Sequence, residues 1–406
     1  MSVDLRIRTD GPREPVRPGE FFDTTLPDAV ADQYDNIAPG LRFLKPRPLT
    51  IEIDGEPWTL AWDDEQVTVN PGTIDGAAYV RMSAEQLHDI VDDQSTFMGL
   101  WTNGALEQTN GHVGHLNNWW LVFRAALDAR LIYTPGSVTF RDRDGDPLDP
   151  RHSFRPDDDR DEMRHFLEEV GYLHIRGLFT EDEMAQVSAD MDAAAPTYTP
   201  DDKRSWWAKT ADGANRVVRM QGFDQHSPTT MDILADRRYL DIGDIPGLGH
   251  QFGVKRTTNR IEALFKPIGI VEGISDIPWH KDCSLGRHSY DCCGVTVGIS
   301  VTGADDVSGQ LHVIPGTHRA LVWAGMLQPR LELPDLPLPT ETGDISVHLS
   351  CTQHMAQAPT ERERRVMYTG FSLPAADPVA AAEARKRLGA VREQAPLTVL
   401  SKHMAS

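Results

Sequence analysis

Residues 279–282 read Trp279-His280-Lys281-Asp282 and place a histidine and a carboxylate two positions apart. Of the fifteen histidines in the chain, only His280 is followed two positions later by an acidic residue. On a regular β-strand, residues i and i+2 point to the same face, so the side chains of His280 and Asp282 would both face inward. A single His-x-Asp pair is a weak signal because it often arises by chance. Its meaning depends on the surrounding sequence.

Short β-type runs surround this pair from Arg260 onward, with Gly, Pro and Asp turns between them. This pattern is typical of an antiparallel sandwich or barrel. The runs cover residues 261–265, 294–301, 311–314, 344–349 and 365–368. A helix–strand–helix pattern over 162–193 precedes them, and an Ala-rich amphipathic helix from Asp377 to about Leu388 follows. We therefore expect a mainly β domain with flanking helices.

A third ligand of a suitable kind, His354, lies downstream of the pair. Two histidines and one carboxylate on one face of an octahedral Fe(II) leave three positions open for small ligands. The candidate catalytic and metal-binding residues are therefore His280, Asp282 and His354. His348 would share the face of His354 on a regular strand and competes for its place. The same ligands would also permit a cupin-like Zn(II) enzyme of another class, such as an isomerase or a hydrolase.

Two motifs give the pair its context. Residues 309–319 read Gly-Gln-Leu-His-Val-Ile-Pro-Gly-Thr-His-Arg, which is similar to the strand and turn of the phytanoyl-CoA dioxygenase (PhyH) family. In that family a Gly-Asp pair precedes the distal iron histidine by ten residues, as Gly343-Asp344 precedes His354 here. The helix–strand–helix pattern over 162–193 also resembles the family's entry to its barrel. The resemblance covers about residues 159–374.

The resemblance implies both a fold and an activity. The fold is a double-stranded β-helix, or cupin-like jelly roll. The activity is that of an Fe(II)/2-oxoglutarate-dependent dioxygenase, an oxidoreductase that hydroxylates or otherwise oxidises an aliphatic C–H bond. Fe(II), 2-oxoglutarate and dioxygen are then required, with His280, Asp282 and His354 as the iron ligands. Arg365, or else Arg364, becomes the cofactor-binding anchor, because a guanidinium grips a carboxylate through two parallel hydrogen bonds.

The chain departs from the family pattern after the distal histidine. A small Gly-Ser pair is usual there, and this chain has Met355-Ala356. Ala356 has no hydroxyl group with which to orient the oxo-acid. Asp282 is intact, and this argues against halogenation, because related halogenases lack the carboxylate where chloride binds.

Composition excludes several classes of partner. The chain has 40 Lys and Arg against 61 Asp and Glu, a formal charge of −21. Such a field repels phosphate backbones, so we expect no nucleic-acid partner. No apolar run approaches the roughly 20 residues of a membrane-spanning helix. Four cysteines without a Cys-x-x-Cys pair indicate a reducing compartment, and we expect a cytoplasmic protein.

The N-terminal part is predicted to hold an arm and a small domain. Residues 1–45 are rich in Pro and Gly and are expected to form an arm with little core. Residues 46–145 combine alternating β-type runs, an Asp54-Gly55 hairpin turn and a capping box at Ser83 and Gln86, typical of a small α/β domain. The catalytic domain would span 146–406, after a charge-dense linker.

Residues 46–130 also resemble the sterol-carrier-protein type of lipid-binding domain, on the strands 58–62 and 67–69 and the strand-to-helix step 80–87. A carrier-like domain beside an oxygenase implies a small hydrophobic, lipid-like or carrier-tethered substrate, such as a natural product. The alternative is a lipid or ligand carrier whose barrel is vestigial. No residue pattern indicates an oligomeric state.

Overall fold

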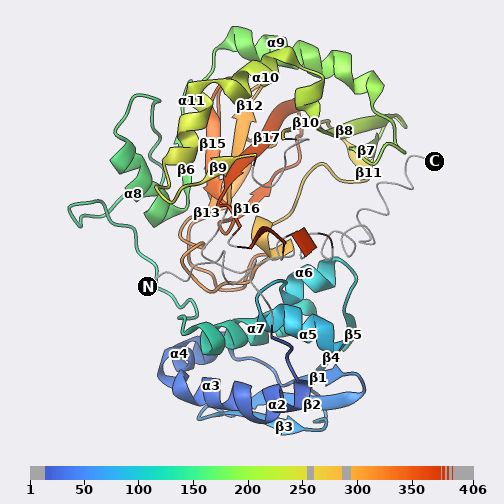
Figure 1. Ribbon diagram of the computed structural model, residues 1–406, viewed down its shortest axis with the longest axis vertical. Coiled ribbons are helices and arrows are strands. Elements are labelled where there is room, and N and C mark those ends of the chain that lie inside the picture. The colour runs from blue at the N-terminus through green and yellow to red at the C-terminus, as the bar shows by residue number, and fades with distance from the viewer. Residues whose placement is uncertain are drawn as a thin grey trace.

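The computed structural model describes residues 14–253, 260–285, 294–375, 377–379, 382–383 and 386. The chain forms a small N-terminal unit and a larger unit built around a β-sheet (Figure 1). The predicted C-terminal helix falls mostly outside the described residues.

The N-terminal unit is built on a five-stranded sheet with the strand order β3-β2-β1-β4-β5. The strands are β1 Leu49–Ile53, β2 Glu56–Trp62, β3 Val67–Pro71, β4 Ala78–Met82 and β5 Glu107–Asn110. The predicted turn joins β1 to β2, with φ of 51° at Asp54 and 95° at Gly55. Positive φ at both turn residues matches the right-handed twist of the flanking strands.

Helices cover this sheet. They are α2 Pro18–Glu20, the π-helix η1 Phe21–Thr25, α3 Leu26–Asp32, α4 Tyr34–Leu44, α5 Ala84–Val91, α6 Phe97–Thr102 and α7 Val113–Asp128. The predicted capping box is present, because the Gln86 N–H donates to Ser83 Oγ at 3.2 Å and the Ser83 N–H donates to Gln86 Oε1 at 2.8 Å. The strongly apolar helix α7 lies in the core of the unit.

The structure differs from the predicted arm. Residues 18–44 are helical and belong to the core of the N-terminal unit, where the ring of Phe22 stacks on Trp58 with centroids 5.0 Å apart. Two prolines of the predicted arm stand in the first turns of helices, Pro18 in α2 and Pro27 in α3, and Pro39 lies inside α4. The missing N–H of proline has no helical partner in the first turn, so proline is tolerated there.

Among the described residues, the larger unit contains a nine-stranded sheet facing a three-stranded one. The large sheet has the order β11-β7-β8-β10-β17-β12-β15-β6, and β9 pairs with β17. Its strands are β6 Tyr172–Ile175, β7 Ser205–Thr210, β8 Asn215–Gln221, β9 Gln251–Phe252, β10 Glu262–Lys266, β11 Ile270–Glu272, β12 Gly294–Ser300, β15 Ile345–Leu349 and β17 Arg364–Ser372. The small sheet joins β13 Leu311–Ile314 to β14 Leu336–Leu338 and β16 Gln353–Ala356. This arrangement is the expected jelly-roll, or double-stranded β-helix.

Helices pack on the outer face of the large sheet (Figure 1). They are α8 Arg160–Val170, α9 Glu181–Ala194, α10 Pro228–Ala235 and α11 Arg237–Leu240. Strand β12 shows how the two faces separate. Val295, Val297 and Ile299 join the core under the helices, whereas Thr296 and Ser300 line cavities inside the jelly roll. This period-2 alternation makes the interior polar.

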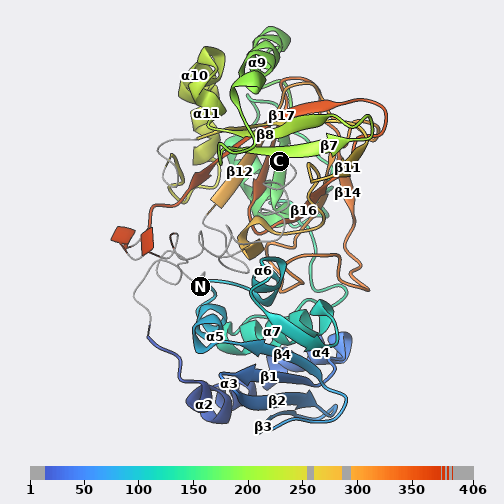
Figure 2. The same ribbon diagram turned by 90° about the vertical axis from the view of Figure 1, so that its right-hand side faces the viewer.

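The two units share a core. Leu321, Trp323 and Ala324 of the larger unit belong to the apolar cluster of the N-terminal unit, and Trp323 Nε1 donates to Asn118 Oδ1 of α7 at 2.9 Å. Figure 2 places α6 at the boundary, directly below the jelly roll. The N-terminal unit is therefore packed against the segment that precedes β14.

Candidate metal centre and active-site cavity

His280 and His354 form one main-chain pair. The His280 N–H donates to the His354 carbonyl at 3.0 Å, and the His354 N–H donates to the His280 carbonyl at 2.9 Å. Each ring is fixed by a contact of its Nδ1 with a carbonyl, that of Pro278 at 2.7 Å and that of Thr352 at 2.9 Å. A carbonyl can only accept, so both Nδ1 atoms carry the proton and both Nε2 atoms keep a lone pair for a metal.

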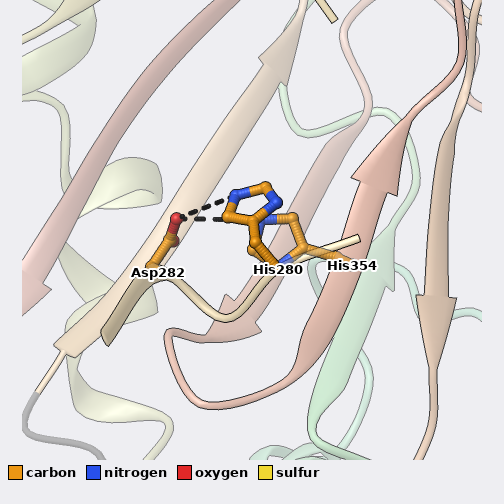
Figure 3. A group of neighbouring side chains, drawn as sticks. All are labelled: His280, Asp282 and His354. Carbon is orange, nitrogen blue, oxygen red and sulfur yellow. Dashed lines mark ion pairs between the residues drawn. The ribbon is translucent and has the colours of Figure 1, made fainter. Parts of the chain in front are cut away.

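Asp282 closes the centre from a short 3-10 helix, η5 Asp282–Leu285. Its Oδ1 lies 3.5 Å from His280 Nε2 and 3.8 Å from His354 Nε2, and one ligand atom from each residue lies within 4.8 Å of the others (Figure 3). Thr296 Oγ1 donates to Asp282 Oδ2 at 2.9 Å, which orients the carboxylate.

The local backbone differs from the strand predicted for residues 280–282. Only His280 makes a ladder-like pair, and the chain turns into η5 at Asp282. Lys281 is fully buried, and its Nζ donates to the Thr317 carbonyl at 2.6 Å. Side chains thus alternate about Lys281 as in a strand, although the ladder ends there.

The electrostatics of the centre suit a cation. Burial opposes ionisation of Asp282, but the neighbouring rings of His354, His280 and His348, in their protonated forms, outweigh it and hold the pKa of the carboxyl well below its usual range. Burial, followed by the neighbouring rings of His280 and His348, holds the pKa of His354 well below its usual range. The centre therefore presents a carboxylate beside neutral imidazole, the protonation state that metal binding requires.

The rival histidine also reaches the centre. His348 Nε2 lies 3.5 Å from Asp282 Oδ2, and its ring centroid is 4.3 Å from that of His354. His348 is on β15 and His354 on β16, so the fold rather than a shared strand brings the rings together. Neither ring nitrogen of His348 has a hydrogen-bond partner among the described residues.

The two arginines predicted as cofactor anchors lie on opposite faces of β17. Arg365 points outward to α9, where its guanidinium donates to the Ser188 carbonyl at 2.8 Å and pairs with Asp192 at 2.8 Å. The structure does not bring Arg365 to the centre. Arg364 is 3% exposed and lines a small interior cavity, and its Nε and Nη2 have no hydrogen-bond partner within the described chain.

A second buried cation lies directly across the sheet from Arg364. Lys266 on β10 is the register partner of Arg364 on β17. Its Nζ donates to the Ser275 carbonyl and to Asp276 Oδ1 at 3.1 Å. Burial and then the charge of Arg364 lower the pKa of Lys266 to about 8, although Asp276 acts the other way. This pair of cations is only partly neutralised by the protein.

A cavity of about 610 Å³ lies at the candidate centre, whereas Arg364 lines the separate small cavity described above. The larger cavity contains the three candidate ligands together with Lys266 and a wall from β7, β8 and β10. The described residues with charged side chains on this cavity are Arg219, Arg260, Glu262, Lys266 and Asp282. Thr102 and Asn103 of the N-terminal unit also line it. The size is typical of a small-molecule site.

The model of the phytanoyl-CoA dioxygenase (PhyH) family matches residues 167–366. Residues 167–366 are a PhyH domain. The match contains the whole candidate metal centre together with Arg364, and the PhyH domain is an Fe(II)/2-oxoglutarate-dependent oxygenase with Fe(II) and 2-oxoglutarate as its cofactors. Two imidazoles and one carboxylate are the donor set that non-haem Fe(II) takes, so the residues present fit the metal.

Several solved structures have a similar fold. EctD from S. alaskensis, with 2-oxoglutarate and 5-hydroxyectoine, is 19% identical over 60% of this chain and 86% of its own, with a TM-score of 0.42. The carbocyclase SnoK from nogalamycin biosynthesis is 17% identical over 54% and 87%, with a TM-score of 0.40. EvdO2 from Micromonospora carbonacea var. aurantiaca, complexed with 2-oxoglutarate, is 18% identical over 54% and 92%, with a TM-score of 0.38. At these scores the solved structures add nothing to the family match.

A search of curated proteins finds no match. No comparison supports the sterol-carrier resemblance of residues 46–130. Within the described residues, every helix is too short or too polar to cross a lipid bilayer.

Proposed function

We propose that the PhyH domain oxidises an aliphatic C–H bond of a small-molecule substrate, with hydroxylation as the reaction. Its iron ligands are His280, Asp282 and His354. The observation that carries this proposal is the convergence of one carboxylate oxygen and two imidazole nitrogens, with the open side of the centre facing a cavity. Iron with 2-oxoglutarate supplies the activation of dioxygen when both are bound.

The protein's own groups prepare this centre. The carbonyls of Pro278 and Thr352 fix the tautomers of the two histidines, and Thr296 holds the second oxygen of Asp282. Such outer contacts set the orientation and basicity of metal ligands. Asp282 therefore offers Oδ1 to the metal while Oδ2 is restrained by a hydrogen bond.

We infer that Arg364, rather than Arg365, anchors the distal carboxylate of 2-oxoglutarate, and that Lys266 assists it. Both cations are buried on the inner face of the sheet, and two of the guanidinium nitrogens of Arg364 have no partner among the described residues. Burying an unpaired guanidinium costs several kcal/mol unless an anion binds it. A dicarboxylate that chelates iron with one end and meets Arg364 with the other supplies that anion.

A Zn(II) hydrolase or isomerase would use the same three ligands. Such an enzyme needs no anionic co-substrate to pair with the buried Lys266 and Arg364. An oxygenase uses 2-oxoglutarate, whose distal carboxylate can bind both cations. The cations therefore favour the oxygenase.

We further propose that the N-terminal unit is an accessory domain that completes the cavity, since Thr102 and Asn103 reach the cavity lining. Nucleic acid is not a proposed partner, because the chain carries a net charge of −21. A cytoplasmic location fits Cys283 and Cys351, whose Sγ atoms lie 3.8 Å apart without a disulfide bond.

Anaerobic titration of the apoprotein with Fe(II) and 2-oxoglutarate tests the function. The chelate gives a weak visible charge-transfer band, which we expect in the native protein and in His312→Ala. His312 is a matched control because its strand, β13, pairs with β16, the strand of His354. The Nδ1 atom of His312 contacts Asp335 Oδ1 at 2.7 Å. His354→Ala should abolish the band. Iron binding without a band in the native protein would overturn the co-substrate assignment.

A further inference from the structure

The cavity wall formed by β8 and β10 carries charged and polar side chains. Arg219 and Gln221 line the cavity, whereas Met220 between them belongs to the core under the helices. Glu262 is the register partner of Gln221 and faces the same side. Side chains alternate along a strand, so these three point inward together. We call Arg219, Gln221 and Glu262 the β8–β10 wall.

The β8–β10 wall presents opposite charges side by side. Arg219 Nη2 pairs with Glu262 Oε2, and Gln221 Nε2 approaches Glu262 Oε1 at 3.4 Å. The guanidinium of Arg219 lies over the ring of Trp206, with its carbon 4.6 Å from the centroid, so the aromatic face holds it in place. Arg219 Nε is buried and has no hydrogen-bond partner among the described residues.

The charge of the cavity contrasts with that of the chain. Acidic residues exceed basic ones by 61 to 40 overall, whereas the charged residues described on the cavity are three cations and two acids. One of the two acids is the candidate iron ligand Asp282. A low-dielectric cleft with an excess of one sign focuses its field on ligands of the other sign. Because Asp224 and Asp276 outside the lining pair with Arg260 and Lys266, however, the cavity presents charges of both signs rather than a surplus of positive charge.

Two of the three cations have other partners. Arg260 Nε donates to Asp224 Oδ2 at 3.2 Å, and Lys266 pairs with Asp276 beside Arg364. The third cation, Arg219, pairs with Glu262 inside the wall, but its Nε has no hydrogen-bond partner among the described residues, so this ion pair offers both a donor and a carboxylate to a ligand that carries both charges. Glu262 beside it can accept a hydrogen bond from a second substrate group. A lipid chain would remove water from this wall and would offer no hydrogen bonds in place of those to water, which is costly.

We propose that the substrate is a small amino acid or hydroxy acid, whose carboxylate binds Arg219 while its neighbouring ammonium or hydroxyl group donates to Glu262. This inference rests on the proposed function and replaces the hydrophobic substrate expected from the sequence. The cavity of about 610 Å³ holds such a molecule together with 2-oxoglutarate. Anchored on the β8–β10 wall, the substrate shares the cavity with the three metal ligands.

The test measures the melting temperature of the full chain, with and without Fe(II) and saturating 2-oxoglutarate under anaerobic conditions. The probes are the proteinogenic L-amino acids, the matching 2-hydroxy acids, the methyl esters of both series, and C8–C12 fatty alcohols. A ligand that binds only the folded protein raises its melting temperature. We expect at least one free acid to do so, and its methyl ester to bind at least about tenfold more weakly through loss of the charged contact.

Arg219→Met should lose the response to the acid but keep the charge-transfer band. Arg216→Met is the matched control, because Arg216 is on the same strand but pairs with Asp212 and Glu363 at the surface. Since Arg219→Met removes the ion-pair partner of the buried Glu262, Arg219→Met/Glu262→Gln is tested beside it and should also lose the response.

Each result decides the question. Failure of every acid to raise the melting temperature, esters or alcohols as effective as the acids, or an undiminished response in Arg219→Met overturns the proposal. The band formed before any probe is added reports on the proposed function separately. If the band is missing while an acid still raises the melting temperature of the native protein but not of Arg219→Met, the substrate subsite stands and the co-substrate assignment fails.

Discussion

His280 and His354 exchange both main-chain hydrogen bonds, at 3.0 and 2.9 Å, so two of the three candidate ligands are one structural pair. Neither histidine can move along the chain direction without breaking a hydrogen bond to the other. Asp282 joins them through the turn that follows Lys281. The centre is therefore rigid in its backbone, and its fine adjustment depends on side-chain contacts such as that of Thr296.

Thr296→Val should weaken iron binding about 10- to 100-fold, because it removes the hydrogen bond to Asp282 Oδ2 while keeping the shape of the side chain. Anaerobic calorimetric titration with Fe(II) measures the effect. Thr210→Val is the control, since Thr210 Oγ1 donates to Asp212 Oδ1 at 2.6 Å in a comparable pair on β7. Equal iron affinity in native protein and Thr296→Val would show that the contact does not orient the ligand.

Arg364→Met should raise the KM for 2-oxoglutarate roughly a hundredfold, because truncating one side of a buried charge pair costs about 3 kcal/mol. Arg365→Met should leave that KM unchanged, since Arg365 binds Ser188 and Asp192 on the outer face. Succinate release at varied 2-oxoglutarate measures both. The reverse pattern would return the anchor to Arg365.

This pair of arginines shows where sequence reasoning stops. The spacing after His354 places an arginine at both the tenth and the eleventh position, and neighbouring residues on a strand face opposite sides. Only the knowledge that α9 covers one face of β17 identifies Arg364 as the inner residue. For the same reason, the sequence does not predict that Arg219 and Glu262 face the same cavity, although polar residues at alternate positions of β8 are a usable signal.

The convergence of the three proposed metal ligands could be predicted because a motif with a structural cause fixes their spacing. Asp344 accepts hydrogen bonds from the N–H groups of Gly177 and Glu341, both at 2.8 Å, and contacts His174 Nε2 at 2.8 Å. These contacts fix the start of β15, and the chain length from there to β16 then sets the position of His354. The helices of residues 18–44 could not be predicted in this way, because Pro in a first turn resembles Pro in a coil.

The affinity for 2-oxoglutarate should fall as pH rises through about 8, the pKa to which burial and Arg364 lower Lys266. A neutral amine no longer attracts the carboxylate, and bound co-substrate would move the loss to higher pH. Lys266→Met should bind more weakly at pH 7 and show little change between pH 7 and 9. Lys209→Met on β7, outside the cavity lining, is the control. Calorimetric titration at several pH values measures this affinity. An affinity of the native protein that does not change with pH would exclude Lys266 from the site.

The lowered pKa of Lys266 also makes the free energy of unfolding depend on pH. Between the lowered pKa of Lys266 and the usual value of 10.5, the unfolded chain binds more protons than the folded one. The free energy of unfolding contributed by Lys266 therefore rises with pH in that window. Lys266→Met should remove this rise, as urea unfolding at pH 8 and pH 10 would measure.

Gly325→Val should disturb the metal centre from the side of the N-terminal unit. The main chain of Gly325 pairs with His280, and a Cβ on Gly325 would lie 3.0 Å from Met98 Cγ of α6. The larger side chain must displace either Met98 or the segment that pairs with His280, at a cost of about 1–3 kcal/mol. We expect reduced iron affinity in Gly325→Val and partial recovery in Gly325→Val/Met98→Ala, measured by Fe(II) titration. Recovery shows that α6 transmits the strain. Equal loss in both variants would mean that the N-terminal unit does not constrain the centre.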